Sequence, residues 1–328
     1  MKDFCVVGSG IAGSTIANLL SKKYSVEIFD KARGPGGRAS NRRYKENLSF
    51  DHGLQYISPK SSLFKKFIKQ IEKQKIIKKW PGNHLDLTFR IKKNLPKYIG
   101  IKGNNDICKY LIKNIKSNFL STVTSIKFNL NHWVITLNGR EKVYFKNLIL
   151  TCPYPQLKKL GVKYLNKTIL NLNPQMAPNV TVIAAYKGSK QVPVSSIKFN
   201  NRIISWAAHE NTKKRFKSKE NLWTIQCTEV YSKKIINLFK NNKKKYQISI
   251  LKEFEELTGY QTKNIVFQNI HGWKYAYNNS NKKITSAWLV KNQLGICADW
   301  LCGSKGEDSW LSSNSLYKDI KKNPPTFK

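Results

Sequence analysis

The residues most able to do chemistry lie in the first thirty positions of the chain. Gly8, Gly10 and Gly13 have the spacing G-x-G-x-x-G. They stand between an apolar run, 4–7, and a helix-like segment, 14–21. In that context Gly8 predicts a tight turn, Gly10 a close approach of the backbone to a pyrophosphate, and Gly13 close packing of the helix on the strand. Because the N-terminus of such a helix presents unpaired N–H groups and a positive dipole end, the pattern predicts a dinucleotide site.

A carboxylate completes the pattern. Asp30 ends a second apolar run, 26–29, and lies 22 residues after Gly8, close to the spacing of about 20 expected for the carboxylate that binds a ribose hydroxyl. Three glycines at this spacing would also fit an ordinary turn, but Asp30 in register argues against that reading. A second glycine-rich segment with Arg33 and Arg38 follows directly. Since NAD does not need this second segment, the pattern favours a different dinucleotide.

That second segment, G-P-G-G-R-A-S at 34–40, resembles the G-G-R-x-S segment with which flavoproteins of the amine-oxidase type bind FAD. The match extends through 41–43 and 50–56, and there it resembles the renalase-like branch of that superfamily, especially its bacterial members. The resemblance implies an FAD-dependent oxidoreductase with noncovalent FAD. Hydride would pass from a small-molecule substrate to the flavin, and O2 would reoxidise it to give H2O2. The resemblance continues, less strongly, at 98–107, 148–156 and 270–276, and is eroded at 294–315.

The fold that this resemblance implies is α/β. We expect a Rossmann-like FAD-binding domain and a second substrate domain of mixed β-sheet plus helices, as in amine-oxidase/hydroxylase-type flavoproteins. Local patterns add detail: apolar spacing through Ile71 predicts a helix from Ser61, and Asn138-Gly139 between alternating segments predicts a β-hairpin. The expected domains are discontinuous, with residues 1–60, 98–160 and 290–328 in the FAD-binding domain and residues 61–97 and 161–289 in the substrate domain.

Candidate site residues follow from the motifs and the resemblance. Arg38 is expected at the FAD pyrophosphate, because a planar guanidinium suits phosphate oxygens. His271 and Gln55 are the catalytic candidates, although His271 would also fit a hydrogen-bonded buried histidine. The aromatic residues Trp206, Trp273 and Tyr275 would wall a flat substrate or simply fill the core. The full set expected at the cofactor is Gly8, Gly10, Ile11, Ala12, Gly13, Asp30, Lys31, Gly37, Arg38, His52, Gly53, Gln55, Val123, Asp299, Asp308 and Ser309.

The C-terminal part of this set departs from the family pattern. Asp299 follows an apolar run, as expected for a residue that binds the ribityl chain or a nearby hydroxyl. Residues 303–309, with the sequence G-S-K-G-E-D-S, stand where the family usually has G-G-R-V-E-G-A. Glu307 and Asp308 predict a helix start with Asp308 as its N-cap rather than an acid–base pair. A carboxylate beside a reduced, anionic flavin would disfavour reduction. The segment therefore keeps a rival hypothesis open, a non-catalytic protein that binds FAD or another nucleotide.

The composition limits the number of domains and the kinds of protein to which the chain could belong. The 328 residues, 40% hydrophobic, allow one large or two ordinary domains. No run of 18 apolar residues predicts a membrane span. The first twenty residues could pass for a signal peptide, but they carry the nucleotide glycines, so we expect them to be retained and the protein to be cytoplasmic. Six cysteines form no C-x-x-C pair and predict reduced thiols, not a metal site.

The net charge of +40 comes mostly from lysine, since only eight of the 59 basic residues are arginine. The lysines are dispersed along the chain, whereas nucleic-acid sites usually combine arginine with stacking aromatic residues in one patch. We therefore expect no specific nucleic-acid partner. The charge suits an anionic substrate better than a cationic amine. For the renalase-like branch the implied substrates are the 2- and 6-dihydro isomers of NAD(P)H, oxidised to NAD(P)+, and an amine is the alternative.

Overall fold

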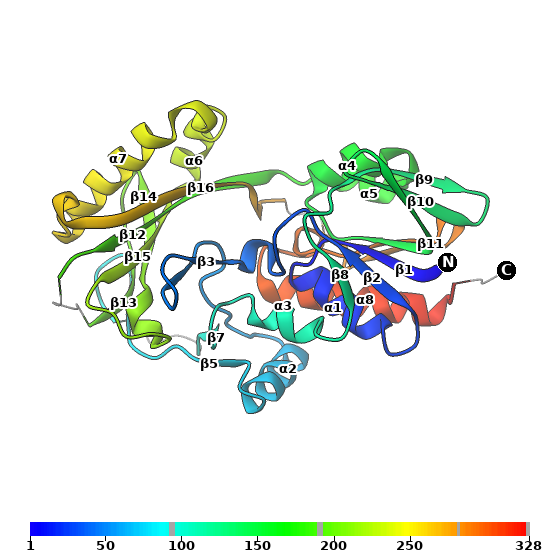
Figure 1. Ribbon diagram of the computed structural model, residues 1–328, viewed down its shortest axis with the longest axis horizontal. Helices are drawn as coiled ribbons and strands as arrows, with labels where there is room; N and C mark the ends of the chain where they lie inside the picture. Colours follow the sequence, from blue (N-terminus) through cyan, green and yellow to red (C-terminus); the bar gives the residue numbers. More distant parts are fainter. Residues whose placement is uncertain (92–95, 189–192, 281–282, 326–328) are drawn as a thin grey trace.

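The computed structural model describes residues 1–91, 96–188, 193–280 and 283–325, which build two sheets and the helices packed on them (Figure 1). The central strand of the first sheet is β1 (Lys2–Val7), which pairs in parallel with β2 (Val26–Phe29) and β11 (Glu141–Leu150). The sheet has eight strands. Six of them follow the order β17-β18-β11-β1-β2-β8, while β10 pairs with β11 and β9 pairs with β10. The remaining strands of this sheet are β8 (Lys116–Asn118), β9 (Val123–Asn129), β10 (His132–Leu137), β17 (Ala287–Leu289) and β18 (Leu294–Ile296).

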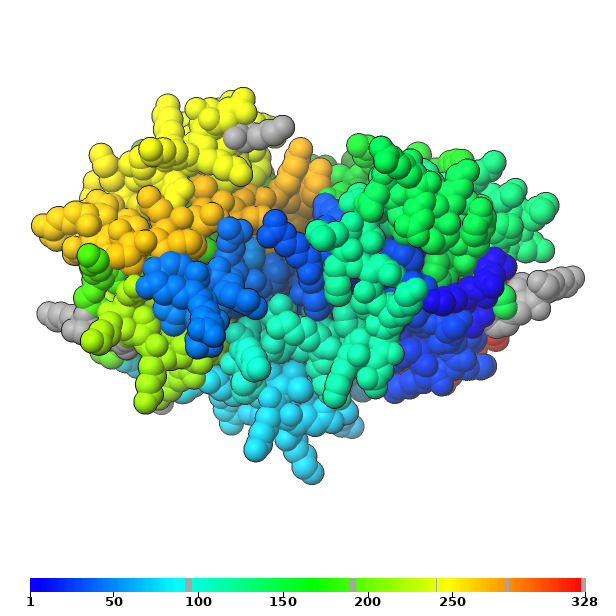
Figure 2. Space-filling view, in the orientation of Figure 1, coloured from blue at the N-terminus to red at the C-terminus, as the bar shows by residue number. Residues whose placement is uncertain are grey.

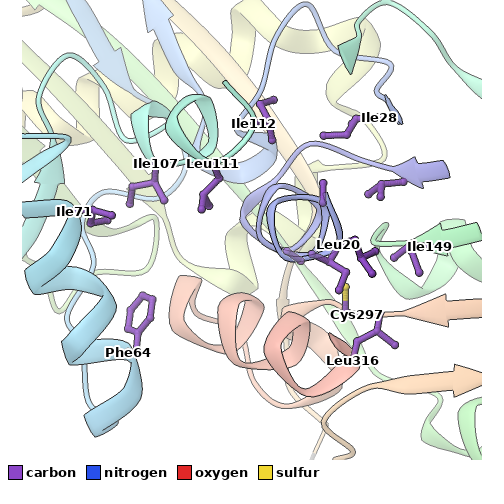
Figure 3. Packing of buried hydrophobic residues seen from close by; sticks show 14 of the residues in the cluster. Leu20, Ile28, Phe64, Ile71, Ile107, Leu111, Ile112, Ile149, Cys297 and Leu316 are labelled. Carbon is purple, nitrogen blue, oxygen red and sulfur yellow. The ribbon is translucent and has the colours of Figure 1, made fainter. Parts of the chain in front are cut away.

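Helices cover one face of this sheet. They are α1 (Ile11–Leu20), α3 (Asp106–Leu111) and α8 (Gly306–Lys322), with α2 (Ser62–Lys73) packed beside them. Figure 3 shows Leu20 of α1 meeting Ile149 of β11 and Leu316 of α8, and all three side chains are fully buried. Each such side chain contributes roughly 1.5–3 kcal/mol through removal of its apolar surface from water. The predicted helix after Ser61 is confirmed, since the Ser61 hydroxyl accepts the Phe64 N–H at its start.

The opposite face carries the β9–β10 hairpin and the helices α4 (Tyr154–Gly161) and α5 (Lys167–Leu172). The predicted turn at Asn138-Gly139 is confirmed between β10 and β11, with φ of 49° and 78°. Both values lie in the left-handed region that the tight turns of hairpins require, which explains the residue types.

The second sheet has six strands in the order β16-β12-β15-β14-β13-β6. Its pairings are antiparallel except for the parallel pair β13–β6. Helices α6 (Glu229–Ile235) and α7 (Phe239–Thr258) cover one face, and even-numbered residues of β12 such as Val180 and Val182 pack in the core beneath them. The strands are β6 (Asn83–Leu85), β12 (Met176–Tyr186), β13 (Val194–Lys198), β14 (Ile204–His209), β15 (Asn221–Cys227) and β16 (Ile265–Asn278).

Two small sheets lie between these layers. One is the hairpin β3 (Asn41–Arg43) with β4 (Ser49–Asp51), and the other pairs β5 (Ile77–Lys79) with β7 (Tyr98–Gly100). In the space-filling view the β3–β4 hairpin, in blue, lies between the yellow and orange residues of the second sheet and the green residues of the first (Figure 2). Among the described helices none is both long and apolar enough to cross a membrane.

The packing refines the expected domain division. The expected ranges include 92–95, 189–192, 281–282 and 326–328, which lie outside the described residues. Three segments expected in the substrate domain pack instead against the first sheet: α2, α5 and β17. Helix α2 buries Phe64 and Ile68 against the same core as α1, and β17 pairs with β18. We therefore propose a two-domain division in which these three segments belong to the FAD-binding part.

Candidate active site

The first glycine turn has the geometry that its spacing predicts. Gly8 has φ of +103°, and a Cβ at Gly13 would lie 1.9 Å from the carbonyl oxygen of Gly8. Gly13 thus lets α1 pack directly against the end of β1, since any side chain there would collide with backbone. Gly10 is the N-cap of α1 and supplies no side-chain cap. The N–H groups of the first helical turn therefore face outward without a capping side chain.

The second glycine segment closes on the first. The Gly36 N–H donates to the carbonyl oxygen of Ser9 at 2.9 Å, and Gly36 forms an isolated bridge with Gly10. Gly36 and Gly37 both have positive φ, and a Cβ at Gly37 would lie 3.2 Å from the Cα of Gly10. The two segments together make a cradle of bare backbone at the start of α1.

Asp30 lies at this cradle, at the end of β2. Its Oδ2 accepts the Ser9 N–H at 2.7 Å and the Ser9 hydroxyl at 2.6 Å, and its Oδ1 accepts the Ala32 N–H at 2.8 Å. These bonds fix the carboxylate at the edge of the cavity described below, which Lys31 also lines.

Arg38 lies where the first sheet approaches β16. One guanidinium nitrogen donates to the carbonyl oxygen of Ala276 at 2.8 Å, and another pairs with Asp299 Oδ1 at 2.5 Å. The sequence predicts both side chains at the cofactor, but it holds no signal for their pairing with each other, since they are 261 positions apart. Both line the cavity, so the pair lies at the expected site.

The start of α8 corrects one prediction. Asp308 is not the N-cap, which is Lys305; it is the third helical residue, and its carboxylate accepts the N–H groups of Ser304 and Lys305 at 2.9 and 2.8 Å. A Cβ at Gly303 would lie 2.2 Å from that carboxylate, so the glycine leaves room for it to fold back. Ser309 lines the cavity, whereas Asp308 is not among the described residues that do.

Glu307 ties α8 to α2. Its carboxylate accepts the N–H groups of Lys60 and Ser61 at 2.8 and 2.7 Å. The prediction that Glu307 and Asp308 start a helix is confirmed, since both lie in the first turn of α8. Neither carboxylate is poised to exchange a proton with a ligand, since each is held by two backbone donors.

A histidine pair and a tryptophan meet on the cavity wall. The ring centroids of His52 and His271 are 5.1 Å apart, and Trp273 lies 4.2 Å from His271. Burial, with the charges of His271 and Arg42, lowers the pKa of His52 to about 4. Burial and the charge of Arg42 also lower the pKa of His271. Both imidazoles are therefore neutral at neutral pH, and the buried Nδ1 of His52 has no hydrogen-bond partner among the described residues.

Gln55 reaches the cavity, but its amide is engaged on both sides. Its nitrogen donates to the carbonyl oxygen of Asp51, and its oxygen accepts from Lys213 Nζ at 3.1 Å. Gly53, between them, also lines the cavity, and a Cβ there would lie 2.1 Å from the Arg38 carbonyl oxygen. Gln55 would contact a substrate directly only by giving up one of these bonds.

Behind Gln55 lies a buried ionic cluster that the sequence analysis missed. Lys213 and Arg215 donate to Asp51 Oδ2 at 2.8 and 2.5 Å, and Lys213 also pairs with Glu210 at 2.9 Å. Burial alone would raise the pKa of the Asp51 carboxyl, but the charges of Arg215 and Lys213 outweigh it and hold that pKa well below its usual range. Burial raises the pKa of Glu210, against the charge of Lys213. The cluster links the β4 strand to the segment after β14.

One cavity of about 1760 Å³ joins the glycine cradle and Asp30 to the Arg38–Asp299 pair and the histidine pair. Its wall includes the glycine cradle, Val123, Ile11 and Ala12 on the first-sheet side, and Trp206, Tyr275 and His271 on the second. Of the predicted site residues, Gly13 lies behind the cavity wall, where its role is packing. Ligand pockets usually measure roughly 300–1,000 Å³, so this cavity has room for a large cofactor together with a second molecule.

The residues present fit an extended dinucleotide cofactor. The cradle is bare of Cβ atoms toward the start of α1, as a pyrophosphate requires. Asp30 follows Gly8 by 22 residues, close to the spacing expected for the carboxylate that binds a ribose hydroxyl, and hydrogen bonds fix it at the cradle. At the other end, the unpartnered Nδ1 of His52 lies in the wall toward the second sheet, where a further ring system would meet it.

Comparisons with known proteins agree with this geometry. Residues 6–71 match the family described as an NAD(P)-binding Rossmann-like domain. The chain is 26% identical over 177 residues to renalase from Mus musculus, a match that covers 51% of this chain and 51% of that protein. The chain thus spans about half the length of the curated relative that it matches.

Solved structures are similar over almost the whole chain. A protein assigned as a protoporphyrinogen oxidase from Exiguobacterium sp. 255-15 superposes with a TM-score of 0.75 at 10% identity, covering 98% of this chain and 99% of that one. Cyclohexylamine oxidase from Brevibacterium oxydans superposes with a TM-score of 0.71 at 9% identity, with the same coverage. At these identities the likeness establishes the fold, and the predicted two-domain flavoprotein fold is confirmed. The fold, the match to a Rossmann-like domain, the similarity to renalase and the glycine cradle together indicate FAD as the cofactor.

Proposed function

We propose that this renalase-like chain is an FAD-dependent oxidoreductase. The observation that carries the proposal is the single cavity that runs from the glycine cradle of the first sheet to the face of the second. A cofactor held at the cradle would place its redox-active ring between the two sheets, where ligand pockets tend to form. A substrate bound against the second sheet would then lie against that ring.

The residues that would hold FAD divide by position. Asp30 would accept a ribose hydroxyl, and Gly10 and Ile11 at the start of α1 would face the pyrophosphate. Arg38 would reach the phosphates from the other side of the cradle. Ser309, in the first turn of α8, would lie near the flavin, where the N-terminus of a helix stabilises negative charge. Bound FAD supplies the redox chemistry, accepting a hydride from the substrate and passing two electrons to O2, which takes up two protons as H2O2.

The protein's own part is to bind, orient and exclude water. Trp206, Trp273 and Tyr275 line the cavity and give a flat substrate an apolar wall. His271 is the polar group that we place in contact with the substrate. Because its pKa is lowered by burial, it would act as a neutral donor or acceptor and not as a cation. Gln55 would fix the loop beside it through Lys213.

The charges of the cavity favour an anionic substrate over an amine. Each of the four carboxylates in its described wall already accepts a hydrogen bond from a protein group, and these are Asp30, Asp86, Asp299 and Glu307. They are outnumbered by cationic side chains, which would repel an ammonium group. The described lining includes Arg38 and the lysines Lys31, Lys60, Lys97, Lys159, Lys198, Lys274 and Lys305.

We therefore propose 2- or 6-dihydro-NAD(P) as the substrate. Its nicotinamide ring loses a hydride to become NAD(P)+, and together with a proton and O2 the reaction yields H2O2. The flat ring suits the aromatic wall, and the phosphates suit the lysines. An amine, as in cyclohexylamine oxidase, is the alternative substrate class.

The cofactor is tested first. The purified protein should be yellow and should release FAD, not a covalent adduct, on denaturation. The apoprotein should regain the flavin spectrum when FAD is added. NAD added instead should not prevent FAD from binding afterwards. Recovery of NAD alone, with no uptake of FAD, would overturn the assignment.

The substrate class is tested by H2O2 formation in air. The FAD-loaded protein is mixed with 2-dihydro-NAD, 6-dihydro-NAD, ordinary NADH, cyclohexylamine and putrescine in parallel. Peroxide from the dihydro isomers supports the proposal. Peroxide from amines alone would make the protein an amine oxidase, and none from any compound would favour a non-catalytic FAD-binding protein.

A further inference from the structure

Four side chains form a row across the second sheet, on the face that lines the cavity. Trp206 on β14 lies opposite Gln226 on β15, which lies opposite Thr181 on β12. Thr181 in turn lies opposite His271 on β16. Side chains that are directly opposite on neighbouring strands share one face of a sheet, and Trp206, Gln226 and His271 all line the cavity. Two strand spacings, about 10 Å, separate Gln226 from His271.

The Gln226 amide is held at one end only. Its nitrogen donates to the carbonyl oxygen of Gly53 at 2.9 Å. Because a carbonyl oxygen can only accept, this bond fixes which end of the amide is the nitrogen, and Oε1 takes the other side. Oε1 accepts no hydrogen bond from the described residues and is not one of the buried atoms that lack a partner. It is therefore an accessible acceptor in the cavity wall.

The neighbouring polar side chains do not occupy this oxygen. The Thr181 hydroxyl donates to Asn179 Oδ1 at 2.9 Å, and Asn179 Nδ2 donates to the carbonyl oxygen of Cys227 at 3.0 Å. Gln55 also lines the cavity, but both ends of its amide are engaged, with Asp51 and Lys213. Gln226 thus keeps an acceptor that Gln55 has already used.

His271 supplies the complementary donor. In the part of the chain that the structure describes, neither of its ring nitrogens has a hydrogen-bond partner, and neither is buried without one. Burial and the charge of Arg42 lower the pKa of His271, so the ring is neutral at neutral pH and carries one N–H. Two hydrogen bonds of about 2.9 Å leave room between His271 and Gln226 for a small group that both donates and accepts. A primary carboxamide is such a group, because its NH2 donates and its carbonyl oxygen accepts.

We propose that Gln226 and His271 recognise the carboxamide of the nicotinamide ring. The carboxamide NH2 would donate to Gln226 Oε1, and the carboxamide oxygen would accept the His271 N–H. Trp206, beside Gln226 in the row, and Trp273, whose ring centroid is 4.2 Å from that of His271, would pack against the ring. This inference rests on the proposed function, because the ring held here is the one that the flavin oxidises.

The test compares two ligands that differ by one hydrogen-bond donor. NAD+ and its acetylpyridine analogue, in which a methyl group replaces the carboxamide NH2, are titrated into the FAD-loaded protein. The shift of the flavin absorbance reports binding beside the flavin. The wild-type protein should bind NAD+ at least about fivefold more tightly, as one hydrogen bond provides. In Gln226→Met the two ligands should bind equally, and a preference unchanged from the wild-type protein would overturn the role of Gln226.

Two further variants separate recognition from loss of the bond to Gly53. Gln226→Glu also loses that bond but keeps an acceptor oxygen, so it should retain the preference for NAD+. Loss of the preference in Gln226→Glu as well as in Gln226→Met would assign the effect to the Gly53 bond and overturn the inference. His271→Phe removes the donor to a carbonyl oxygen that both ligands carry, so it should weaken both by a similar factor.

A matched control is Gln268, an exposed glutamine of β16 that is not among the described residues of the cavity wall. Gln268→Met should keep the full preference for NAD+. The outcome also separates this inference from the proposed function. If neither ligand binds to the wild-type protein, the proposed substrate class fails and the inference fails with it. If both bind equally well, only the carboxamide site is overturned.

Discussion

Removal of Lys213 should destabilise the protein far more than removal of an ordinary surface lysine. Its side chain is fully buried and donates to Asp51 at 2.8 Å, to Glu210 at 3.0 Å and to Gln55 at 3.1 Å. In Lys213→Met two buried carboxylates face Arg215 alone. Breaking one partner out of a buried ionic cluster costs about 3–5 kcal/mol, because an uncompensated charge is left behind.

The control is Lys45, whose salt bridge with Glu220 measures 2.6 Å but is half exposed. Lys45→Met should cost far less, because exposed ion pairs contribute little to stability. Both variants are unfolded in urea with FAD at a fixed saturating concentration, and the free energies of unfolding are compared. If the two substitutions cost the same, the buried cluster does not stabilise the junction between β4 and the segment after β14.

The cost should also depend on pH. Burial already raises the pKa of Glu210, and without Lys213 the folded protein would take up a proton there more readily than the unfolded chain. The stability of Lys213→Met should therefore fall as pH rises through the raised pKa, and the penalty should be smaller at pH 5 than at pH 8. The double variant Lys213→Met/Glu210→Gln removes the excess carboxylate and should recover part of the loss. A double variant less stable than the single one would refute this electrostatic reasoning.

Three further predictions concern the cavity. Arg38→Met should weaken FAD binding by about 1.5–3 kcal/mol if one charge-assisted contact is lost. The affinity is measured by equilibrium dialysis, with the exposed Arg140→Met as the control. An unchanged affinity would show that Arg38 does not contact FAD. Gly13→Ala puts a Cβ 1.9 Å from the Gly8 carbonyl oxygen and should cost both stability, by about 1–3 kcal/mol, and FAD binding. Gly34→Ala, with nothing within 4 Å of its Cβ, should leave the thermal stability unchanged. His52, with its pKa lowered from 6.5 to about 4, binds its proton less readily in the folded protein than in the unfolded chain. Its contribution to stability, about 3 kcal/mol, should therefore be lost as pH falls from about 6.5 to about 4. His52→Asn should flatten that part of the unfolding profile, and an identical profile would count against the neutral buried ring.

The cofactor cradle could be predicted from the sequence because its signals are local. The φ of +103° at Gly8 and the 1.9 Å clearance at Gly13 are properties of single positions in a short strand–turn–helix unit. The turn at Asn138-Gly139 is equally local. Each residue type reports a backbone conformation that few others tolerate, so spacing alone carries the prediction.

The buried cluster could not be predicted in the same way. Lys213 is one of the 51 lysines that remain when eight arginines are taken from 59 basic residues, and nothing near it in the sequence marks it as buried. Its partner Asp51 is 162 positions away. The β6–β13 pair is likewise formed by short strands distant in the chain, for which periodicity gives little signal.

The error at Asp308 has a physical reason. A carboxylate at the expected start of a helix fits the N-cap and the third helical position almost equally, because both accept backbone N–H groups there. Gly303 decides between them, since a side chain at that position would collide with the folded-back carboxylate. The Asp308 carboxylate accepts two backbone N–H groups at the start of its own helix. The departure from the family pattern at this position therefore puts no unpaired Asp308 carboxylate beside the flavin. This weakens the case for a non-catalytic protein.

The central claim is that a substrate in this cavity reduces bound FAD. It is tested most directly by mixing the FAD-loaded protein anaerobically with one equivalent of 2- or 6-dihydro-NAD and following the absorbance band of oxidised flavin. We expect rapid loss of the band, with one NAD+ formed for each flavin reduced, and its return with H2O2 when O2 is admitted. An absorbance that stays unchanged with both isomers, or that falls only with amines, would contradict it.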